Sequence, residues 1–270
     1  MSRLRKAEAV AREAGRGIWA PEMKLLVEGA LGSTAPVAYN LEAEVRMAEV
    51  CDMYDARAFH VRFLETIAEL EEVEAIMKNE DWEAAKRLDA TTRGTKCAAQ
   101  FSVDNLWYRA EVLGSAKEKG KVEVVFIDYG NKEVVTAAAL RKLPAAAFKF
   151  RPQAARAELA GIKAKGLSAG ELGVQCGKEF KAAVWERKLR VQEVGRAGGG
   201  LLQVVIWSKP EDAHKYQASV NARLLKKGLA RSEAGLPLAM QKAFDGAQTE
   251  AKVEQLGLWE EDEEDEDEGF

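Results

Sequence analysis

Residues 94–143 carry the side chains most suited to chemistry in this chain. The segments DNLWYRA at 104–110 and FIDYGN at 126–131 flank two strand-like runs around a polar turn. We therefore expect a compact β unit that brings four aromatic rings toward one point. Ring faces attract cations, and an amide beside them can accept an N–H. The pattern predicts a binding site for a soft, methylated cation.

Composition sets broad limits on this chain of 270 residues, which is long enough for one large or two medium domains. No run of 18 apolar residues appears, so we expect no membrane partner. The three cysteines are widely spaced, which predicts neither a disulfide framework nor a zinc site. We therefore expect a reducing, intracellular compartment. We expect no cofactor and no bound metal.

Charge is unevenly distributed along the chain. Residues 260–268 are nine consecutive acids, and such a run repels itself and stays disordered. Removing their charge from the net charge of −4 leaves the rest of the chain at about +5. The folded part is thus mildly basic, which is compatible with nucleic acid without establishing it.

Short strands separated by polar or glycine-bearing turns are predicted for the central unit. They are expected at 96–101, 107–113, 121–127 and 132–135, followed by one helical turn at 140–143. Such spacing suits a small barrel. Before it, residues 37–64 predict a β-hairpin. Residues 65–88 predict a helix with an apolar stripe made of Ile67, Leu70, Val73, Ile76 and Met77.

The C-terminal half predicts more strands and then helices. Strands are expected at 156–162, 188–194 and 201–207, a short helix or strand at 180–185, and helices at 220–229 and 240–256. The pattern A-x3-A-x5-G-aliphatic-W occurs at residues 7–19 and again at 247–259. This repeat predicts the last helices of two consecutive modules, and hence a C-terminal piece of a longer repeat protein. Chance similarity of two alanine-rich helices is the alternative.

The two central motifs resemble a Tudor domain. The flanks at 49–61, 221–230 and 256–259 resemble the opening hairpin and the closing helices of a staphylococcal-nuclease-like module. A Tudor barrel inserted into a split nuclease-like module is the extended Tudor arrangement. Over residues 1–260 the chain resembles the C-terminal region of the Tudor staphylococcal nuclease family.

The resemblance implies a mainly β, α+β fold: an SH3-like Tudor barrel inserted into a split nuclease-like OB-fold barrel and joined to it by a long helix. The expected parts are a terminal helix of a preceding module at 1–19, a linker at 20–36, the first part of the split domain at 37–64, the connecting helix at 65–88, the Tudor barrel at 89–145, the rest of the split domain at 146–259 and a disordered acidic tail at 260–270.

The same resemblance implies a methylarginine reader. It places an aromatic cage for symmetrically dimethylated arginine at Phe101, Tyr108, Phe126 and Tyr129, with Asn131 bonding the guanidinium. Position 126 is often tyrosine in this family, and phenylalanine keeps the ring face. The implied partners are Arg-Gly-rich tails of the Sm or Piwi type, in RNA silencing or splicing. The implied location is cytoplasmic and also nuclear.

Asp128 has two interpretations. Its carboxylate is either an electrostatic partner beside the cage or a turn residue bonded to its own backbone, and we favour the turn. The alternative interpretation of the rings themselves is barrel core, which we favour for Trp107. Gly130 is expected to supply a positive φ.

A catalytic role is the competing class of function. Nuclease chemistry needs carboxylates for Ca²⁺, a base and arginines. Asp52 and Asp55 lie in a predicted hairpin turn, and Arg151 and Arg156 have no evident partners. We therefore expect this region to be catalytically dead, with any nuclease activity in other modules of the full-length protein.

RNA binding through a basic surface of the nuclease-like module is the second alternative. These basic side chains could equally well form an ordinary solvent-exposed surface that binds nothing. The candidate contacts are Lys181, Arg187, Lys188, Arg190, Lys226 and Lys227. Phosphate binding would weaken steeply with salt.

Overall fold

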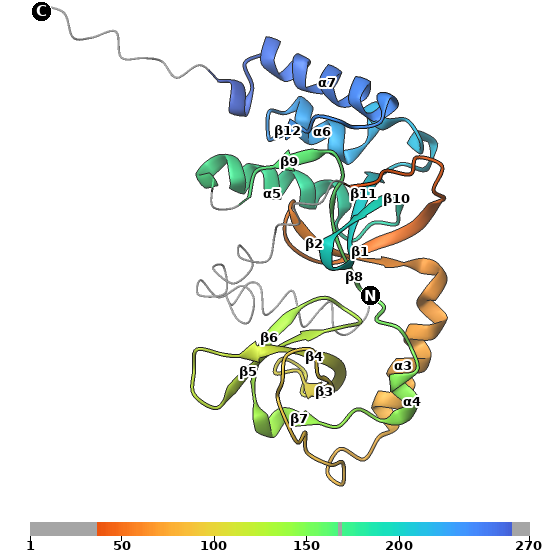
Figure 1. Ribbon diagram of the computed structural model, residues 1–270, viewed down its shortest axis with the longest axis vertical. Coiled ribbons are helices and arrows are strands. Elements are labelled where there is room, and N and C mark those ends of the chain that lie inside the picture. Colours follow the sequence, from red (N-terminus) through yellow and green to blue (C-terminus); the bar gives the residue numbers. More distant parts are fainter. Residues whose placement is uncertain (1–36, 167–168, 261–270) are drawn as a thin grey trace, which may run out of the picture. The chain divides into compact units, whose positions relative to one another are not determined.

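A computed structural model describes residues 37–166 and 169–260 of the chain. The predicted helix at 1–19, the linker and residues 261–270 of the acidic tail lie outside these residues. The chain divides into two compact units (Figure 1). Within the described residues, one unit comprises 60–155 and the other 37–59 with 156–260.

The unit at 60–155 is built on a five-stranded sheet in the order β6-β5-β4-β3-β7, with all neighbours antiparallel. Its strands are β3 (Lys96–Gln100), β4 (Trp107–Ser115), β5 (Lys121–Phe126), β6 (Lys132–Thr136) and β7 (Leu140–Arg141). Alternation along β4 buries Ala110 and Val112 in one core and turns Arg109 to the opposite face. The four predicted strands are confirmed with end shifts of one or two residues.

Helix α3 (Ile67–Asn79) packs against this sheet. Its buried residues Leu70, Val73 and Met77 follow helical spacing, as predicted. The helix is shorter than the predicted 65–88. A residue that follows the helix caps its C-terminal turn: Trp82 Nε1 donates to the carbonyl of Met77 at 2.9 Å.

The helical turn predicted at 140–143 is wrong. Leu140 and Arg141 form β7, which pairs with β3 through Ala99 and Ala98. The sheet thus satisfies backbone groups that a single helical turn would leave unpaired. Helix α4 (Ala145–Phe148) begins only after Pro144.

The second unit is built on a closed barrel in the order β1-β10-β11-β8-β2, whose strand β2 runs on into the first unit, and on a separate β12-β9 pair. Its strands are β1 (Val45–Asp55), β2 (Ala58–Phe63), β8 (Ala155–Leu159), β9 (Ile162–Ala164), β10 (Leu189–Ala197), β11 (Leu201–Trp207) and β12 (Ala230–Ser232). The predicted hairpin at 37–64 is β1 and β2. The strand predicted at 156–162 is two strands, because Gly161 turns the chain with a φ of 69°.

Helices α5 (Gly170–Val184), α6 (Val220–Lys226) and α7 (Leu238–Val253) complete this unit (Figure 1). Buried Asn221 ties α6 to the barrel by donating to the carbonyls of Ala160 and Val204, at 2.9 and 3.1 Å. The segment predicted as helix or strand at 180–185 is the end of α5. No helix in the described part of the chain has the length and apolarity to span a bilayer.

The three cysteines are free and buried, as expected for inert core residues. Burial raises the pKa of the Cys97 thiol to about 12 and that of Cys176 to about 12. Neither thiol is therefore a thiolate at neutral pH, and neither is a candidate nucleophile.

A buried ion pair organises the unit at 60–155. The Arg109 guanidinium donates twice to the Asp128 carboxylate, at 2.8 and 2.5 Å. It also donates to the carbonyls of Ala147, Phe150 and Arg151, at 2.8, 2.8 and 2.9 Å. All five guanidinium N–H groups are thus used. The segment after α4 is held to β4 through one side chain.

Replacing Asp128 by asparagine should destabilise the chain by about 3 kcal/mol, because the Arg109 charge would be left buried without its counter-ion. Urea unfolding followed by intrinsic fluorescence measures this loss. Glu72→Gln is the matched control: its pair with Lys149 spans 3.5 Å between exposed side chains, so the change should stay below about 1 kcal/mol. Equal, small losses in both variants would contradict the assigned role of the pair.

Candidate functional site

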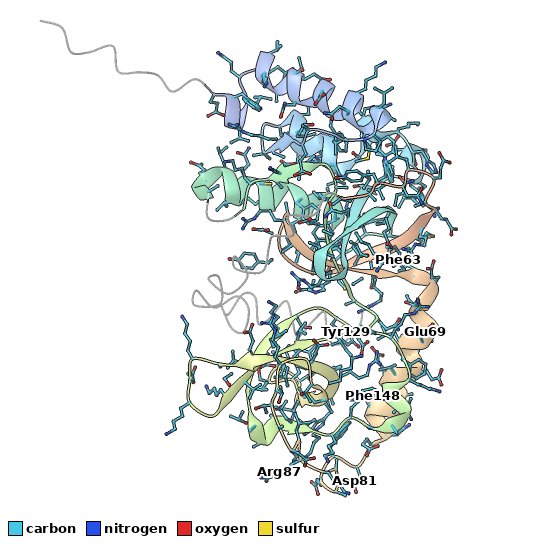
Figure 2. The ribbon with its side chains drawn as sticks, viewed as in Figure 1. Phe63, Glu69, Asp81, Arg87, Tyr129 and Phe148 are labelled. Atoms are coloured by element: carbon cyan, nitrogen blue, oxygen red, sulfur yellow. The ribbon has the colours of Figure 1, made fainter. Side chains whose placement is uncertain are left out.

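Four aromatic rings gather at one end of the five-stranded sheet. Phe101 follows β3, Tyr108 lies on β4 and Phe126 ends β5. Tyr129 lies in the loop that follows β5 (Figure 2). We call these four side chains the ring cluster. Tyr108 stands nearly perpendicular to the other three, with ring centroids 6.4 Å from Phe101, 6.0 Å from Phe126 and 5.4 Å from Tyr129. The structure thus brings together all four rings predicted from sequence.

Phe101 and Tyr129 both pack edge-on against the Tyr108 ring. Each ring meets Tyr108 at close to a right angle, 81° and 83°. Phe126 closes the cluster from within, 5.3 Å from Phe101 and only 1% exposed. Aromatic rings gathered in this way can attract a delocalised cation such as a guanidinium.

Asn131 adds a polar group on the same loop as Phe126 and Tyr129. The side chain is 5% exposed, and its Oδ1 accepts no hydrogen bond within the described residues. Buried carbonyl oxygens are usually paired, and an unpaired one calls for an explanation. The fifth predicted site residue therefore offers an acceptor that the surrounding fold leaves available.

The loop at 126–131 owes its shape to Gly130, which has a φ of 94° as predicted. Its amide donates to the Phe126 carbonyl at 2.7 Å. A Cβ at this position would stand 2.3 Å from the His60 ring. Only glycine combines this backbone conformation with that close approach, so the glycine fixes where Tyr129 and Asn131 lie.

Both tyrosine hydroxyls of the ring cluster are anchored by carboxylates. Tyr108 donates to Asp104 Oδ2 at 2.8 Å, and Tyr129 donates to Glu74 Oε1 on α3. Burial raises the pKa of Tyr129, and the hydrogen bond to Glu74 raises it further. Tyr129 therefore stays neutral, and its orientation is fixed from the hydroxyl end.

Asp128 fills neither role proposed from sequence. Its carboxylate accepts from Arg109 and from the backbone amide of Gln153, the latter at 3.1 Å. It does not bond the backbone of its own turn in the described structure, and its charge is matched by Arg109. The backbone carbonyl of Asp128 accepts from Arg62 at 2.6 Å, and that guanidinium lies 5.1 Å from the Tyr129 ring centroid.

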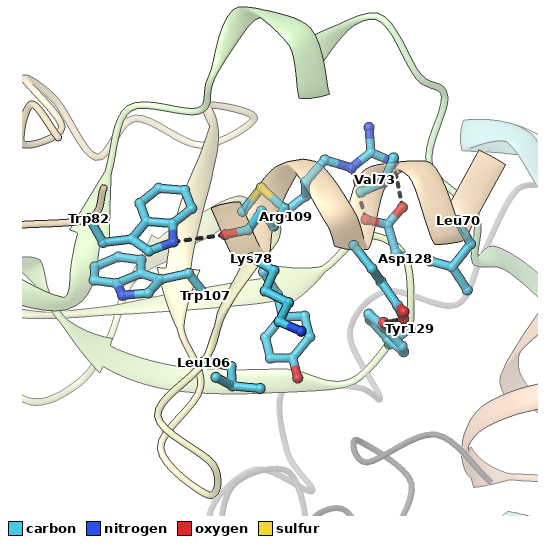
Figure 3. A pocket seen from close by; sticks show the side chains of 12 residues that line it. Leu70, Val73, Lys78, Trp82, Leu106, Trp107, Arg109, Asp128 and Tyr129 are labelled. Carbon is cyan, nitrogen blue, oxygen red and sulfur yellow. Dashed lines mark hydrogen bonds and ion pairs between the residues drawn. The ribbon is translucent and has the colours of Figure 1, made fainter. Parts of the chain in front are cut away.

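A cavity of about 420 Å³ lies between α3 and β4, next to the ring cluster (Figure 3). Tyr108 and Tyr129 line it together with ten other residues: Leu70, Val73, Glu74, Met77, Lys78, Trp82, Leu106, Trp107, Arg109 and Asp128. Trp82 and Trp107 stack at 4.9 Å within this wall. Trp107 thus packs structurally, as predicted.

The predicted RNA-contact residues all lie in the other unit, on α5, β10, α6 and the segments between them. Lys226 pairs with Glu250, and Lys227 pairs with Glu179 at 2.7 Å. Lys181 lies 5.8 Å from the Trp185 ring centroid. Lys181, Arg187 and Lys188 are exposed, and Arg190 is half-buried. The charges of Lys226 and Lys227 are thus matched by acids of the same unit.

Two of the residues considered for nuclease chemistry, Asp55 and Arg151, have contacts that the structure describes. Asp55 accepts from the backbone amide of Arg57 at 2.8 Å and from its guanidinium at 3.0 Å, as a turn residue does. Within residues 37–166 and 169–260, no three His, Cys, Asp or Glu side chains converge as metal ligands. Arg151 is largely exposed, 3.8 Å from Glu69.

Two protein families match successive parts of the chain. Residues 41–161 match the Tudor domain family, and residues 168–261 match the staphylococcal nuclease homologue family. The chain combines a Tudor domain with a staphylococcal-nuclease-like domain. The predicted resemblance to the extended Tudor region of Tudor staphylococcal nuclease proteins is confirmed.

Relatives and solved structures agree with this assignment. Ribonuclease TUDOR 2 of Arabidopsis thaliana is 33% identical over 189 residues, which are 62% of this chain and 19% of that protein. The chain thus spans about a fifth of that relative. The extended Tudor domain of Drosophila melanogaster Tudor-SN superimposes with a TM-score of 0.69 at 23% identity, covering 81% of this chain and all of that one.

The human TDRD1 extended Tudor domain, solved in complex with a symmetrically dimethylated peptide, has a TM-score of 0.62. It is 27% identical to this chain and covers 74% of it and 96% of the human chain. The predicted fold, a Tudor barrel with a split nuclease-like barrel, is therefore confirmed.

Sequence reasoning missed the residues that hold the Tudor site in place. Two of them, Glu74 and Arg62, come from other elements, and no local motif marks them. The third, Arg109, lies on the opposite face of β4. Glu133 was also missed, although its alternation with Asn131 along β6 was visible. It is 6% exposed and accepts from the Ser102 amide at 3.3 Å, beside Phe101.

Glu133→Gln should make stability less sensitive to pH. Burial raises the pKa of Glu133, and nearby Asp104 raises it further. Because the folded-state pKa exceeds the unfolded one, the wild-type chain loses stability as the pH rises through the folded-state pKa. At pH 7 the urea concentration at the unfolding midpoint should therefore be higher for the variant than for the wild type. Near pH 4 the two midpoints should be the same.

Urea titrations at both pH values measure this difference, and the exposed Glu83→Gln serves as the control. A difference between Glu133→Gln and the wild type that is the same at both pH values would refute the role assigned to burial.

Proposed function

We propose that this chain reads symmetrically dimethylated arginine through an aromatic cage made of the ring cluster and Asn131. The observation that carries the proposal is the buried Asn131 oxygen, unpaired within the described residues, on the same loop as two of the four rings. An apolar core would not need that acceptor. A guanidinium N–H entering between the rings would satisfy it.

The chemistry of methylarginine matches these groups. Methylation keeps the positive charge and replaces N–H donors by methyl groups, so fewer hydrogen bonds to water are lost on entry. Each good ring contact contributes about 0.5–2 kcal/mol. After the costs of association, a single site should bind with a dissociation constant of roughly tens of micromolar or weaker. Repeated Arg-Gly sites would raise the apparent affinity.

Solved relatives support the ligand class. The human TDRD1 domain carries a symmetrically dimethylated peptide, and mouse TDRD1 was solved with a MILI peptide containing dimethylarginine. We infer that the partners of this chain are Arg-Gly-rich tails of RNA-associated proteins, of the Sm or Piwi type. A cytoplasmic and nuclear location and a role in RNA silencing or splicing belong to the same proposal.

We further infer that the nuclease-like domain serves as a scaffold without catalysis. The turn role of Asp55 and the ion pairs of Lys226 and Lys227 support this inference. Relatives named ribonucleases are about five times the length of the matched segment. Nuclease activity of a longer protein would then reside in its other modules.

Calorimetry with one Arg-Gly peptide in four states tests the reader function. We expect the symmetric dimethyl form to bind more tightly than the asymmetric, monomethyl and unmodified forms. Asn131→Ala should lower that affinity about tenfold, since a ligand N–H would lose its acceptor. Tyr129→Ala should abolish binding, and Asn40→Ala, an exposed asparagine in the nuclease-like domain, should leave it unchanged.

Equal binding of all four peptides that disappears at moderate salt would contradict the cage. It would instead favour phosphate-type contacts of the basic nuclease-like surface, which could then be tested directly with RNA.

A further inference from the structure

The cavity between α3 and β4 extends away from the inner part of the ring cluster. Phe101 and Phe126, the two deeper rings of the cluster, do not line it. Its walls are mainly apolar, formed by Leu70, Val73 and Met77 of α3 and by Trp82, Leu106 and Trp107 opposite (Figure 3). At about 420 Å³ it lies in the size range of ligand pockets and exceeds the needs of one methyl group.

The charged residues in the lining are largely committed to each other. Arg109 and Asp128 form the buried ion pair, and Glu74 accepts from the Tyr129 hydroxyl. Lys78 is exposed near the end of α3, so its ammonium is in water. The cavity therefore suits an apolar occupant far better than a phosphate or a carboxylate.

The position of the cavity indicates where that occupant comes from. Tyr108 and Tyr129 belong both to the ring cluster and to the cavity wall, and their ring centroids are 5.4 Å apart. The ring cluster and the cavity thus have these two tyrosine rings in common. In an extended peptide, side chains two residues apart point to the same side, about 7 Å from each other. A peptide with methylarginine in the cage would therefore present a neighbouring side chain to the cavity.

We propose that this cavity is a second subsite of the Tudor domain, taking a large apolar side chain two residues from the methylated arginine on the same peptide. Phenylalanine, leucine and methionine have the required size and chemistry. The inference rests on the proposed reader function and narrows its ligand class. A methylated peptide with only glycine beside its arginine should bind weakly. A peptide with an apolar residue two positions from the arginine should bind more tightly.

Leu106 offers the means to test the subsite without unfolding the barrel. It is 45% exposed and lies in the loop before β4, so Leu106→Gln removes an apolar wall and leaves the core intact. Leu238→Gln is the matched control, because Leu238 is 85% exposed on α7 and lines no part of the cavity.

The experiment is calorimetry of the full chain with three symmetrically dimethylated Arg-Gly peptides. One has glycine on both sides, one has phenylalanine two residues before the modified arginine, and one has it two residues after. We expect phenylalanine at one of these positions to tighten binding about tenfold. That gain should fall to about threefold or less in Leu106→Gln and persist in Leu238→Gln. Contacts between the phenylalanine ring and the Leu106 methyls, seen as NOEs, provide a readout independent of the variants.

Each contrary result has a distinct meaning. If methylation controls binding but phenylalanine gives no gain at either position, the subsite is refuted and the reader function stands. If phenylalanine tightens binding equally in Leu106→Gln, its contact lies elsewhere, and the subsite is likewise refuted. If Leu106→Gln alters only the oligomeric state, the cavity holds a second copy of the chain and the proposal fails. Binding that ignores methylation refutes both the reader function and the subsite.

Discussion

The Tudor domain depends on one buried ion pair, Arg109 with Asp128. Strand alternation places Arg109 on the face of β4 opposite Tyr108, and Asp128 directly precedes Tyr129. Joining these two charges therefore fixes the backbone beneath both tyrosines of the ring cluster. The same guanidinium donates to three backbone carbonyls, one within α4 and two in the segment that follows it. Such a pair contributes little net stability compared with apolar packing, but it defines one arrangement of the backbone.

The ligand site inherits its geometry from this arrangement. Tyr108 and Tyr129 are held from one end by the paired backbone and from the other by Asp104 and Glu74. Their hydroxyls are thus already bonded, and the Arg62 guanidinium lies 5.1 Å from the Tyr129 ring centroid. Asn131 lacks such a partner within the described residues, which makes its oxygen the polar group available to a ligand. Rings that need no rearrangement on binding lose little conformational entropy.

Sequence alone predicted the parts of this site that are local. The two motifs at 104–110 and 126–131 contain most of the rings and the amide, and the strands around them follow from alternation and turns. Contacts between distant segments could not be predicted. Glu74 lies 55 residues before Tyr129, and Arg109 lies about 40 residues before its carbonyl partners. The wrong helical turn at Leu140 has the same origin, because pairing with β3 outweighed a local helical preference.

The central claim is that the methyl groups of dimethylarginine lie against the faces of these rings. A peptide carrying ¹³C-labelled methyl groups on its symmetrically dimethylated arginine tests it most directly, by NMR titration with the full chain. The rings should move the methyl resonances upfield through their ring currents, and Tyr129→Ala should reduce that movement. Saturable binding that shifts other peptide resonances and leaves the methyl resonances in place would show that the arginine lies outside the ring cluster.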